Sequence, residues 1–359
     1  RSTLFPYTTS SDLSDTEVVV QFSEEVDEST SELASNYLID GGISVNSASL
    51  DIDRSTLVLS TSTLTNGQSY TLSINNVSDL SGNAILSNSE SYFDYIVIEE
   101  ALPWDIVINE FLADPEDNND DFVELYNRSN KFIDIEGWIL ADESSQSPPL
   151  SSFILAPDSY LIIYDEDAAR DYASYGDAIS IPSLTLNNSD DQIELLDDAS
   201  NRIAFVFYSA PPDEEISYEL VNPNDPCISE SSYSASTALA GFTPGTQNSV
   251  FDDTPDTTPP TISSFGYSTS LTINFSEVMD AESLSMGSYD LFNLTIDQII
   301  VEGDFPTSIE IVFSESIELG QNYSLTSADL KDCAGNSIAE TTISFGFGRR
   351  PTFYVIIIT

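Results

Sequence analysis

The side chains best suited to chemistry in this chain are the carboxylates of one acidic loop, Asp114-Pro-Glu-Asp-Asn-Asn-Asp-Asp121. Hard divalent cations bind about six to eight oxygen atoms from carboxylates, amides and carbonyls. The loop offers five carboxylates and two amides, although it lacks the central glycine and the final glutamate of an EF-hand loop. We therefore predict a Ca²⁺ site, against the alternative of a solvated connection between strands, with the ligands Asp114, Glu116, Asp117, Asn119 and Asp121.

Composition excludes most other reaction chemistry. The 359 residues include no His and two Cys, so a Ser-His-Asp triad, a Cys-His pair and a His-bound metal are ruled out. A pair of carboxylates, as in glycosidases, is the one catalytic arrangement left. Because there are 61 acidic residues, many such pairs lie close by chance, and no motif selects one. We predict that the chain is not an enzyme.

The charge balance restricts the partners. Nine basic residues against 61 acidic ones give a net charge of -52 at pH 7, which repels phosphate backbones and anionic lipids. We therefore predict no nucleic-acid partner. No apolar run reaches the roughly 18 residues of a membrane-spanning helix, so no membrane insertion is predicted. Cation binding, solubility in a salty outside medium and plain surface solubility all stay open as explanations of the acidity.

The two cysteines, Cys227 and Cys333, stand far apart in the sequence. In a chain outside the cell that has no metal-binding motif, two cysteines favour a disulfide. We predict a bridge between them. Reduced thiols, or bonding partners elsewhere, are the alternatives.

The acidic loop joins two of three consecutive β-strands predicted at residues 106–111, 122–127 and 133–140. These short apolar runs are rich in β-branched and aromatic residues, and polar or glycine-containing joints separate them. Similar runs with regular turn signals recur along the chain, which predicts β-sandwiches. Further strands are expected at residues 18–22, 37–39, 43–50, 57–60, 70–74, 153–155, 160–164, 192–196 and 203–208, with short helical turns at 31–36 and 165–175.

The sequence also repeats itself at one offset. Three short sequence motifs each recur 253 positions later: Phe22-Ser-Glu24 as Phe275-Ser-Glu277, Gly67-Gln-Ser-Tyr70 as Gly320-Gln-Asn-Tyr323, and Gly82-Asn83 as Gly335-Asn336. Repetition of this kind indicates a modular array. We expect the two phenylalanines to anchor hydrophobic cores and the glycines of the Gly-Asn pairs to supply positive φ at turns.

Motifs in this sequence resemble those of two protein families. The central stretch carries Ile108-Asn109-Glu110, Glu124-Leu-Tyr-Asn127, Ser129, Ile133-Asp-Ile135, Gly137-Trp-Ile-Leu140 and, near its end, Gly241-Phe-Thr-Pro-Gly245-Thr-Gln-Asn248-Ser249. It resembles the lamin-tail domain, an immunoglobulin-type β-sandwich of nuclear lamins and bacterial surface proteins. The repeat, with Phe275-Ser-Glu-Val-Met-Asp280 and Asp332–Asn336 in its second copy, resembles the bacterial Ig-like domain of S-layer and other surface proteins. In the first copy, nothing resembles the opening strand at residues 259–265.

The expected architecture is therefore all-β, with tandem β-sandwiches in the order Ig-like, lamin-tail, Ig-like. We place the domains at residues 1–100, 101–250 and 251–348, with a stiff Asp/Thr/Pro-rich linker at 251–260. Residues 349–359 are interpreted as a linker and the first strand of a following module. The chain begins without Met or an apolar signal region, and we interpret it as part of something longer.

The resemblance and the absence of catalytic motifs predict a secreted structural or adhesive protein of the bacterial cell surface. We expect a rod-like array of modules, such as an adhesin stalk or a filament, with bound Ca²⁺. Other copies or other surface proteins are the expected partners, joined by addition of the exposed terminal strand. The alternative is an accessory module of a larger secreted protein that binds polysaccharide or protein. Trp104 and Trp138 could stack on glycans, although core packing is the simpler interpretation of Trp138.

Overall fold

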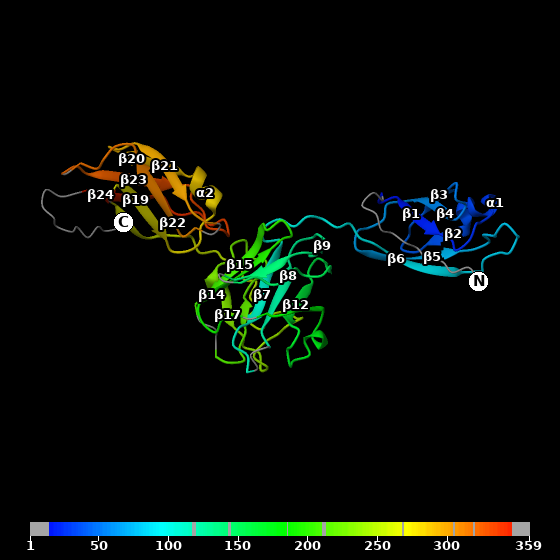
Figure 1. Ribbon diagram of the computed structural model, residues 1–359. Helices are drawn as coiled ribbons and strands as arrows, with labels where there is room; N and C mark the ends of the chain where they lie inside the picture. Colours follow the sequence, from blue (N-terminus) through cyan, green and yellow to red (C-terminus); the bar gives the residue numbers. More distant parts are fainter. Residues whose placement is uncertain are drawn as a thin grey trace. The chain divides into compact units, whose positions relative to one another are not determined.

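The computed structural model describes residues 14–116, 120–142, 145–184, 186–209, 213–267, 269–303, 306–318 and 320–346 (Figure 1). Contacts divide the chain into two units. The first takes the chain up to Ala101 together with residues 129–135 and 152–158, and the second takes the remainder. Both consist mainly of antiparallel strands, which confirms the predicted all-β class and its tandem Ig-like sandwiches. In these ranges no helix has the length and apolarity that crossing a bilayer requires.

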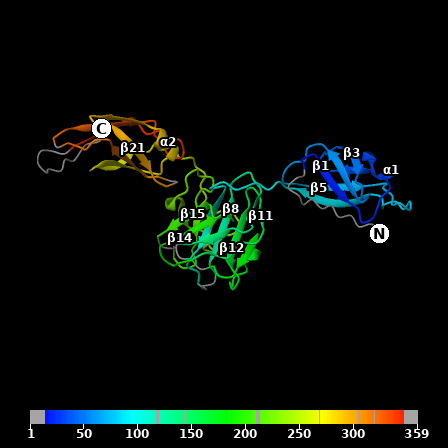
Figure 2. The same ribbon diagram turned by 45° about the horizontal axis from the view of Figure 1, so that its top comes forward.

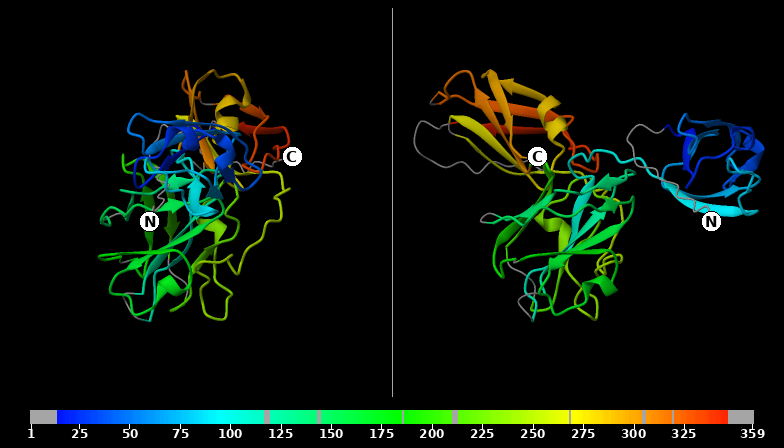
Figure 3. Two further views of the ribbon diagram at one scale, coloured as in Figure 1. Left: turned by 90° about the vertical axis from the view of Figure 1, so that its right-hand side faces the viewer. Right: turned by 45° about the vertical axis from the view of Figure 1, so that its right-hand side comes forward.

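The N-terminal sandwich packs two three-stranded sheets, β1-β4-β3 and β2-β5-β6, around one core. Figure 3 shows this sandwich in dark blue to cyan. In β4, Leu57 and Leu59 are fully buried and the intervening Val58 is half-buried, because successive side chains of a strand point to opposite faces. The elements are β1 Glu17–Gln21, α1 Glu28–Ser31, η1 Ala34–Asn36, β2 Tyr37–Ile39, β3 Val45–Leu50, β4 Thr56–Thr61, β5 Gln68–Ile74 and β6 Ser89–Tyr95.

The central sandwich has a six-stranded sheet, in the order β13-β12-β8-β7-β16-β17, and a three-stranded sheet, β10-β14-β15. Strands β7 and β8 are buried at every position, and β8 and β12 run beside each other in Figure 2. The strands are β7 Ile106–Leu112, β8 Phe122–Asn127, β10 Ile139–Ala141, β12 Tyr160–Asp165, β13 Ala178–Ile181, β14 Asp191–Leu196, β15 Arg202–Tyr208, β16 Tyr218–Leu220 and β17 Tyr233–Ala235, with 3-10 turns η2 Tyr172–Ser174 and η3 Glu230–Ser232. The short pair β9 Ile133–Asp134 and β11 Ile154–Leu155 belongs by its contacts to the first unit.

The C-terminal sandwich pairs a four-stranded sheet, β18-β19-β22-β21, with a three-stranded sheet, β20-β23-β24. The short helix α2 lies beside β21, as Figures 1 and 2 show. The side chain of Asp280 caps this helix by accepting a hydrogen bond from the Ser283 N–H. The elements are β18 Ile262–Tyr267, β19 Ser270–Phe275, α2 Ala281–Met286, β20 Ser288–Phe292, β21 Ile296–Val301, β22 Ser308–Phe313, β23 Tyr323–Ala328 and β24 Thr341–Phe345.

The two Ig-like copies agree in detail at the offset found in the sequence. Phe22 and Phe275 are each 5% exposed within their cores, which confirms their anchoring role. The turn glycines Gly82 and Gly335 have φ of 82° and 89°, as expected. Even an isolated bridge is repeated, because Val26 pairs with Asp79 and Met279 pairs with Asp332.

Three expectations differ from the structure or fall outside it. The single strand expected at 133–140 is divided into β9 and β10, because Gly137 adopts φ 82° in a turn between them. The first copy has no described counterpart of β18, whose equivalent positions fall at residues 9–14, of which 9–13 lie outside the described ranges. The terminal strand expected within residues 349–359 also lies outside them.

The alternation in β23 gives a direct test of the C-terminal core. Leu325 is 1% exposed in that core, whereas Thr326 faces the other side of the strand and is half-buried. We expect Leu325→Ala to lower the free energy of unfolding of this sandwich by about 2–5 kcal/mol. We expect Thr326→Ala to lower it by less than about 1 kcal/mol. Calorimetry would measure both, and equal losses would contradict the assigned core face.

Candidate functional site

The most unusual feature of the central sandwich is a row of three glutamates inside it. Glu110 of β7 pairs in register with Glu124 of β8 on one side and with Glu219 of β16 on the other. All three are 0% exposed. A bulge in β7, between Ile108 and Glu110, gives β7 an extra residue at Asn109 and brings Glu110 opposite Glu124. Buried carboxylates are unfavourable unless they are hydrogen-bonded, so their partners decide what the row does.

The partners of the row come mainly from the closing segment, residues 241–250. Glu110 accepts hydrogen bonds from the Thr243 N–H at 2.7 Å and from the Ser217 hydroxyl at 2.6 Å. Glu124 accepts from the Gly245 N–H. Glu219 accepts from the Ser249 hydroxyl at 2.8 Å and from the Val250 N–H at 3.0 Å. The three carboxylates therefore bind the segment to the sheet along most of its length.

Two buried asparagines complete this attachment. The Asn248 amide donates to the backbone oxygens of Asn109 at 2.9 Å and of Leu220 at 2.8 Å. In return the Asn109 amide donates to the Asn248 side-chain oxygen at 2.9 Å and to Glu124 at 2.8 Å. Asn248 thus bridges β7 and β16. The two sequence motifs around residues 109 and 248 are therefore in direct contact in the fold.

The hydrogen bonds of Thr243 locate a proton in the row. Its single hydroxyl lies 3.2 Å from Glu110 Oε2 and 3.0 Å from Glu219 Oε1. One hydroxyl hydrogen cannot serve both oxygens, so one carboxyl group must itself donate. Burial raises the pKa of Glu110 to about 7, which favours the protonated form of this carboxyl group as the donor to Thr243 below neutral pH. Burial, and then the charge of Glu110, raises the pKa of Glu124 to about 8.

This arrangement has the character of a structural clasp. Every oxygen of the three glutamates already has a protein partner, and none of the three side chains is exposed to a substrate. We call residues 109, 110, 124, 219, 243, 245, 248 and 249 the glutamate clasp. The family motifs in the sequence contain most of these residues, but no site was predicted from them. The signal that could have revealed it is the set of glutamates inside otherwise apolar strands.

The predicted cation ligands are only partly brought together. Asp121 is 2% exposed, and burial followed by the charge of Asp165 and then of Asp114 raises its pKa to about 8. Asp114 accepts a hydrogen bond from the Asn188 amide. Glu116 is exposed, and its backbone N–H donates to Glu215 at 2.7 Å. Asp117 and Asn119 lie outside the described residues. The contribution of Asp165, from a segment expected to be a helical turn, was missed.

A second acidic group occurs near the C-terminal sandwich. Among the described residues, Asp256, Glu277 and Asp332 can bring one ligand atom each within 4.8 Å of one another. Both oxygens of the buried Asp332 already accept hydrogen bonds from Asn336, at 2.7 Å from its N–H and 2.9 Å from its amide. The same Asp–Asn pairing recurs in the first copy at Asp79 and Asn83, where no counterpart of Asp256 is described. This repeated turn is sufficient to explain Asp332.

The structure also joins Cys227 to Cys333 by a disulfide, with Cα atoms 5.7 Å apart and a sequence separation of 106. Cys227 follows β16, and its N–H donates to the Asp225 carboxylate at 2.9 Å. Cys333 lies directly after Asp332 in the turn that precedes Gly335. The bond therefore connects two segments on either side of the linker at residues 251–260.

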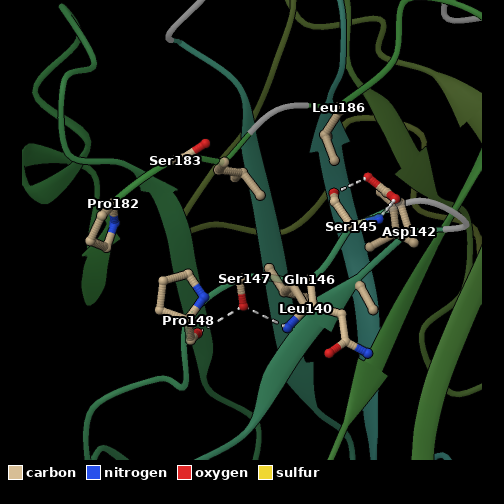
Figure 4. Close-up of a pocket in the computed structure, with 12 residues that line it drawn as sticks. Leu140, Asp142, Ser145, Gln146, Ser147, Pro148, Pro182, Ser183 and Leu186 are labelled. Atoms are coloured by element: carbon tan, nitrogen blue, oxygen red, sulfur yellow. Dashed lines mark hydrogen bonds between the residues drawn. The ribbon is translucent and has the colours of Figure 1, made fainter.

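The central sandwich has an open groove of about 540 Å³. Figure 4 shows the residues that line it. Its wall combines apolar side chains, including Leu140 and Leu186, with two prolines, Pro148 and Pro182. The hydroxyl of Ser147 accepts a hydrogen bond from the Leu140 N–H at 3.0 Å and donates to the Pro148 oxygen at 2.9 Å. Trp138 is only 4% exposed and does not line the groove.

The raised pKa values of Glu110 and Glu124 predict how stability depends on pH. Between about pH 5 and 8 the unfolded glutamates are ionised while the folded ones retain protons, so the free energy of unfolding should fall as pH rises and level off above about pH 8. At about 1.4 kcal/mol per pH unit for each retained proton, the two glutamates should together contribute several kcal/mol to this fall. Both Trp residues, Trp104 and Trp138, belong to the central sandwich, so Trp fluorescence in denaturant would report its unfolding.

Glu110→Gln should lose less stability between pH 5 and pH 8 than the native chain does, because its amide donates to Thr243 at either pH as the protonated carboxyl does. The matched control is Glu214→Gln, which removes the same charge from an exposed position and should keep the native slope. A Glu110→Gln variant with an undiminished pH slope would place the proton elsewhere.

Comparison with protein families finds two matches in the chain. Residues 100–210 match the family Lamin Tail Domain, and residues 2–95 match the family Bacterial Ig-like domain. No curated protein sequence matches. The match to the lamin-tail family ends before the closing segment that the clasp binds.

Solved structures with some likeness include the N-terminal part of the bacterial S-layer protein SbsC, at 17% identity and a TM-score of 0.23, covering 56% of this chain and 42% of that one. Domains 1-6 of surface layer protein SbsC follow, at 9% identity and 0.22, with 94% and 53% covered. The human Desmocollin-1 ectodomain has 10% identity and 0.18, with 95% and 56% covered. The chain thus spans about half the length of these proteins. The chain contains a bacterial Ig-like domain followed by a lamin tail domain.

Proposed function

We propose that this chain is a structural segment of a secreted protein on a bacterial cell surface, in which β-sandwich modules act as a spacer. The observation that carries the proposal is the disulfide between Cys227 and Cys333. Disulfides persist in oxidising compartments outside the cytoplasm and are rare within it. A bond that ties a segment of the central sandwich to a turn of the C-terminal one suits a protein that must resist separation of its modules.

The glutamate clasp supports the same role. Its polar groups are engaged with one another, so the sandwich uses its most distinctive side chains to hold its own closing segment. That segment leads directly into the linker at residues 251–260. Force applied along the chain would reach the clasp through this connection. The clasp and the disulfide would then carry load together.

The negative net charge of the chain supports a location outside the cell. With a net charge of -52 the chain repels other anionic surfaces, and salt or bound cations must screen it for modules to come close. We propose that modules follow one another as a rod-like array in a stalk, adhesin or filament. Other copies or other surface proteins are the proposed partners, joined by addition of a terminal strand. No reaction is proposed.

Surface exposure and assembly can be tested directly. Antibodies raised against residues 14–346 should label intact cells that make the protein, and protease added outside should remove the signal. Labelling only after lysis would overturn the surface role. Negative-stain imaging and sedimentation of the purified chain would separate an extended monomer from a fibre.

The groove of Figure 4 favours a second candidate, an accessory module that binds polysaccharide or protein. Its volume of about 540 Å³ is of the size that holds small ligands, and it combines apolar walls with a few fixed polar groups. A glycan array tests the idea with the native chain and with Leu186→Arg, which would fill the groove. Binding lost in the variant would support this candidate, and an array with no signal would remove glycans as its ligand.

The disulfide gives a separate prediction. After protease cleavage within residues 251–260, the two fragments should migrate on a denaturing gel as one species without reductant and as two with it. Cys227→Ser should give two species without reductant, whereas the control Ser231→Ala, a nearby exposed change, should still give one. Because both cysteines of the chain are in this one bond, a mass measurement that finds two free thiols would exclude it.

A further inference from the structure

We propose that Arg128 and the disulfide form a short path for tension through the central sandwich. Tension enters at Trp104 and passes through the guanidinium of Arg128 to Asp225. It leaves through Cys227, two residues later in the chain. This inference rests on the proposed role of the chain as a spacer, and it assigns that role to particular residues. Arg128 acts in it as a positioning residue that holds two segments of backbone.

The Arg128 side chain joins two backbone segments that are far apart in the sequence. Its Nε donates to the backbone oxygen of Trp104 at 2.6 Å. Its Nη1 donates to the backbone oxygen of Pro223 at 3.2 Å and to that of Asp225. The first oxygen lies where the chain enters the sandwich before β7, and the other two belong to the loop after β16. A guanidinium stays charged and presents its donors in a rigid fork, so it can hold several carbonyl oxygens at once.

The entry segment is fixed from both sides at Trp104. Its φ of 69° is unusual for a bulky residue, and such a conformation persists only where the surroundings hold it. The Trp104 N–H donates to the backbone oxygen of Ile203 at 2.7 Å, while its own oxygen accepts from Arg128. The centroid of the Trp104 ring lies 5.3 Å from that of Phe205. A pull on the chain at this point therefore acts on Arg128 before it acts on β7.

The exit lies two residues from the contact with Arg128. Cys227 follows Asp225 with one proline between them, and its N–H donates to the Asp225 carboxylate at 2.9 Å. Two prolines in this loop fix φ, which leaves the loop little slack. Tension that arrives from Cys333 through the disulfide is therefore delivered within two residues of a carbonyl that Arg128 holds.

The disulfide also removes a long stretch of chain from the path of tension. Residues 228–332 form a covalently closed loop, with a sequence separation of 106 between the cysteines. This loop contains the closing segment, the linker and strands β18 to β23. The clasp and the disulfide then act in parallel. Because the disulfide cannot lengthen, it limits how far the clasp and these strands can be stretched.

The competing interpretation is that Arg128 only stabilises the end of β8. It follows Asn127, the last residue of β8, and its backbone N–H donates to the Asp105 oxygen at 3.0 Å. A residue with that role would stabilise the sandwich equally whether the disulfide is closed or open. A residue in the path of tension matters more when tension leaves through Cys227 than when it leaves through the linker. The two interpretations therefore differ in how the effect of Arg128 depends on the disulfide.

The test is force-clamp spectroscopy of the full chain, held by its two ends, with and without reductant. Reduction should lengthen the fully extended native chain by about 35–38 nm, because it releases the closed loop. With the disulfide closed, the central sandwich of Arg128→Lys should open at least about tenfold faster at constant force, because lysine lacks the donor fork. In reductant the acceleration should be less than about threefold, because tension then reaches the clasp first. The matched control Arg202→Lys, at an exposed position, should stay within about threefold in both states.

The possible outcomes separate this proposal from the spacer role. Equal acceleration in both states would assign Arg128 to fold stability alone and overturn the proposal, while the disulfide and the spacer role would stand. An extended length that reductant leaves unchanged would overturn the proposal and also remove the disulfide that carries the proposed function.

A measurement on the native chain decides the matter if Arg128→Lys fails to fold. By NMR, the Nε–H of Arg128 should exchange with water at least about tenfold more slowly than that of Arg54, whose side chain is 42% exposed. Equal exchange rates would show that the guanidinium does not hold the entry segment, and would overturn the proposal.

Discussion

The central sandwich depends on the attachment of its closing segment to the row of Glu110, Glu124 and Glu219. Residues 241–250 contribute no strand to either sheet of the central sandwich. They are held instead by side chains that reach out of the sheet to backbone N–H groups and hydroxyls. A carboxylate accepts such bonds more strongly than a neutral group does, provided that the charge is compensated. The clasp achieves this with several donors and with the raised pKa values of Glu110 and Glu124, which favour their protonated forms.

A proton held by a glutamate of the row reduces the buried negative charge without placing a metal cation or a lysine side chain in the core. When Glu110 is protonated, a hydrogen-bond chain from Glu110 through Thr243 to Glu219 satisfies both carboxyl groups without a countercharge in the core. The chain has nine basic residues for 61 acidic ones, so basic partners are scarce everywhere. Arg170, which forms ion pairs with Asp120 and Glu215, is a basic partner of this kind. It lies at the margin of the six-stranded sheet and not within it.

The two Ig-like copies are stabilised by the same set of local contacts. Each has a phenylalanine at the end of its first common strand, a Gly-Asn turn and an aspartate that bonds its own turn asparagine. These contacts are local in sequence, so they survive duplication without any change elsewhere. The second copy differs by carrying Cys333 in that turn, which adds a covalent connection to the central sandwich.

The sequence by itself determined the all-β class, most strands and the repeat, because alternation of apolar residues and turn glycines are local signals. It also determined that Phe22 and Phe275 are core residues and that Gly82 and Gly335 have positive φ. It could not show the division of residues 133–140 into two strands, since β9 and β10 pair with different strands, β11 and β14, which follow later in the chain. Nor could it show that the charge of Asp165 acts on Asp121, or assemble Glu110, Glu124 and Glu219. Those groups meet only when strands distant in the chain pair in a fixed register, and that register is set by the packing of the whole sandwich.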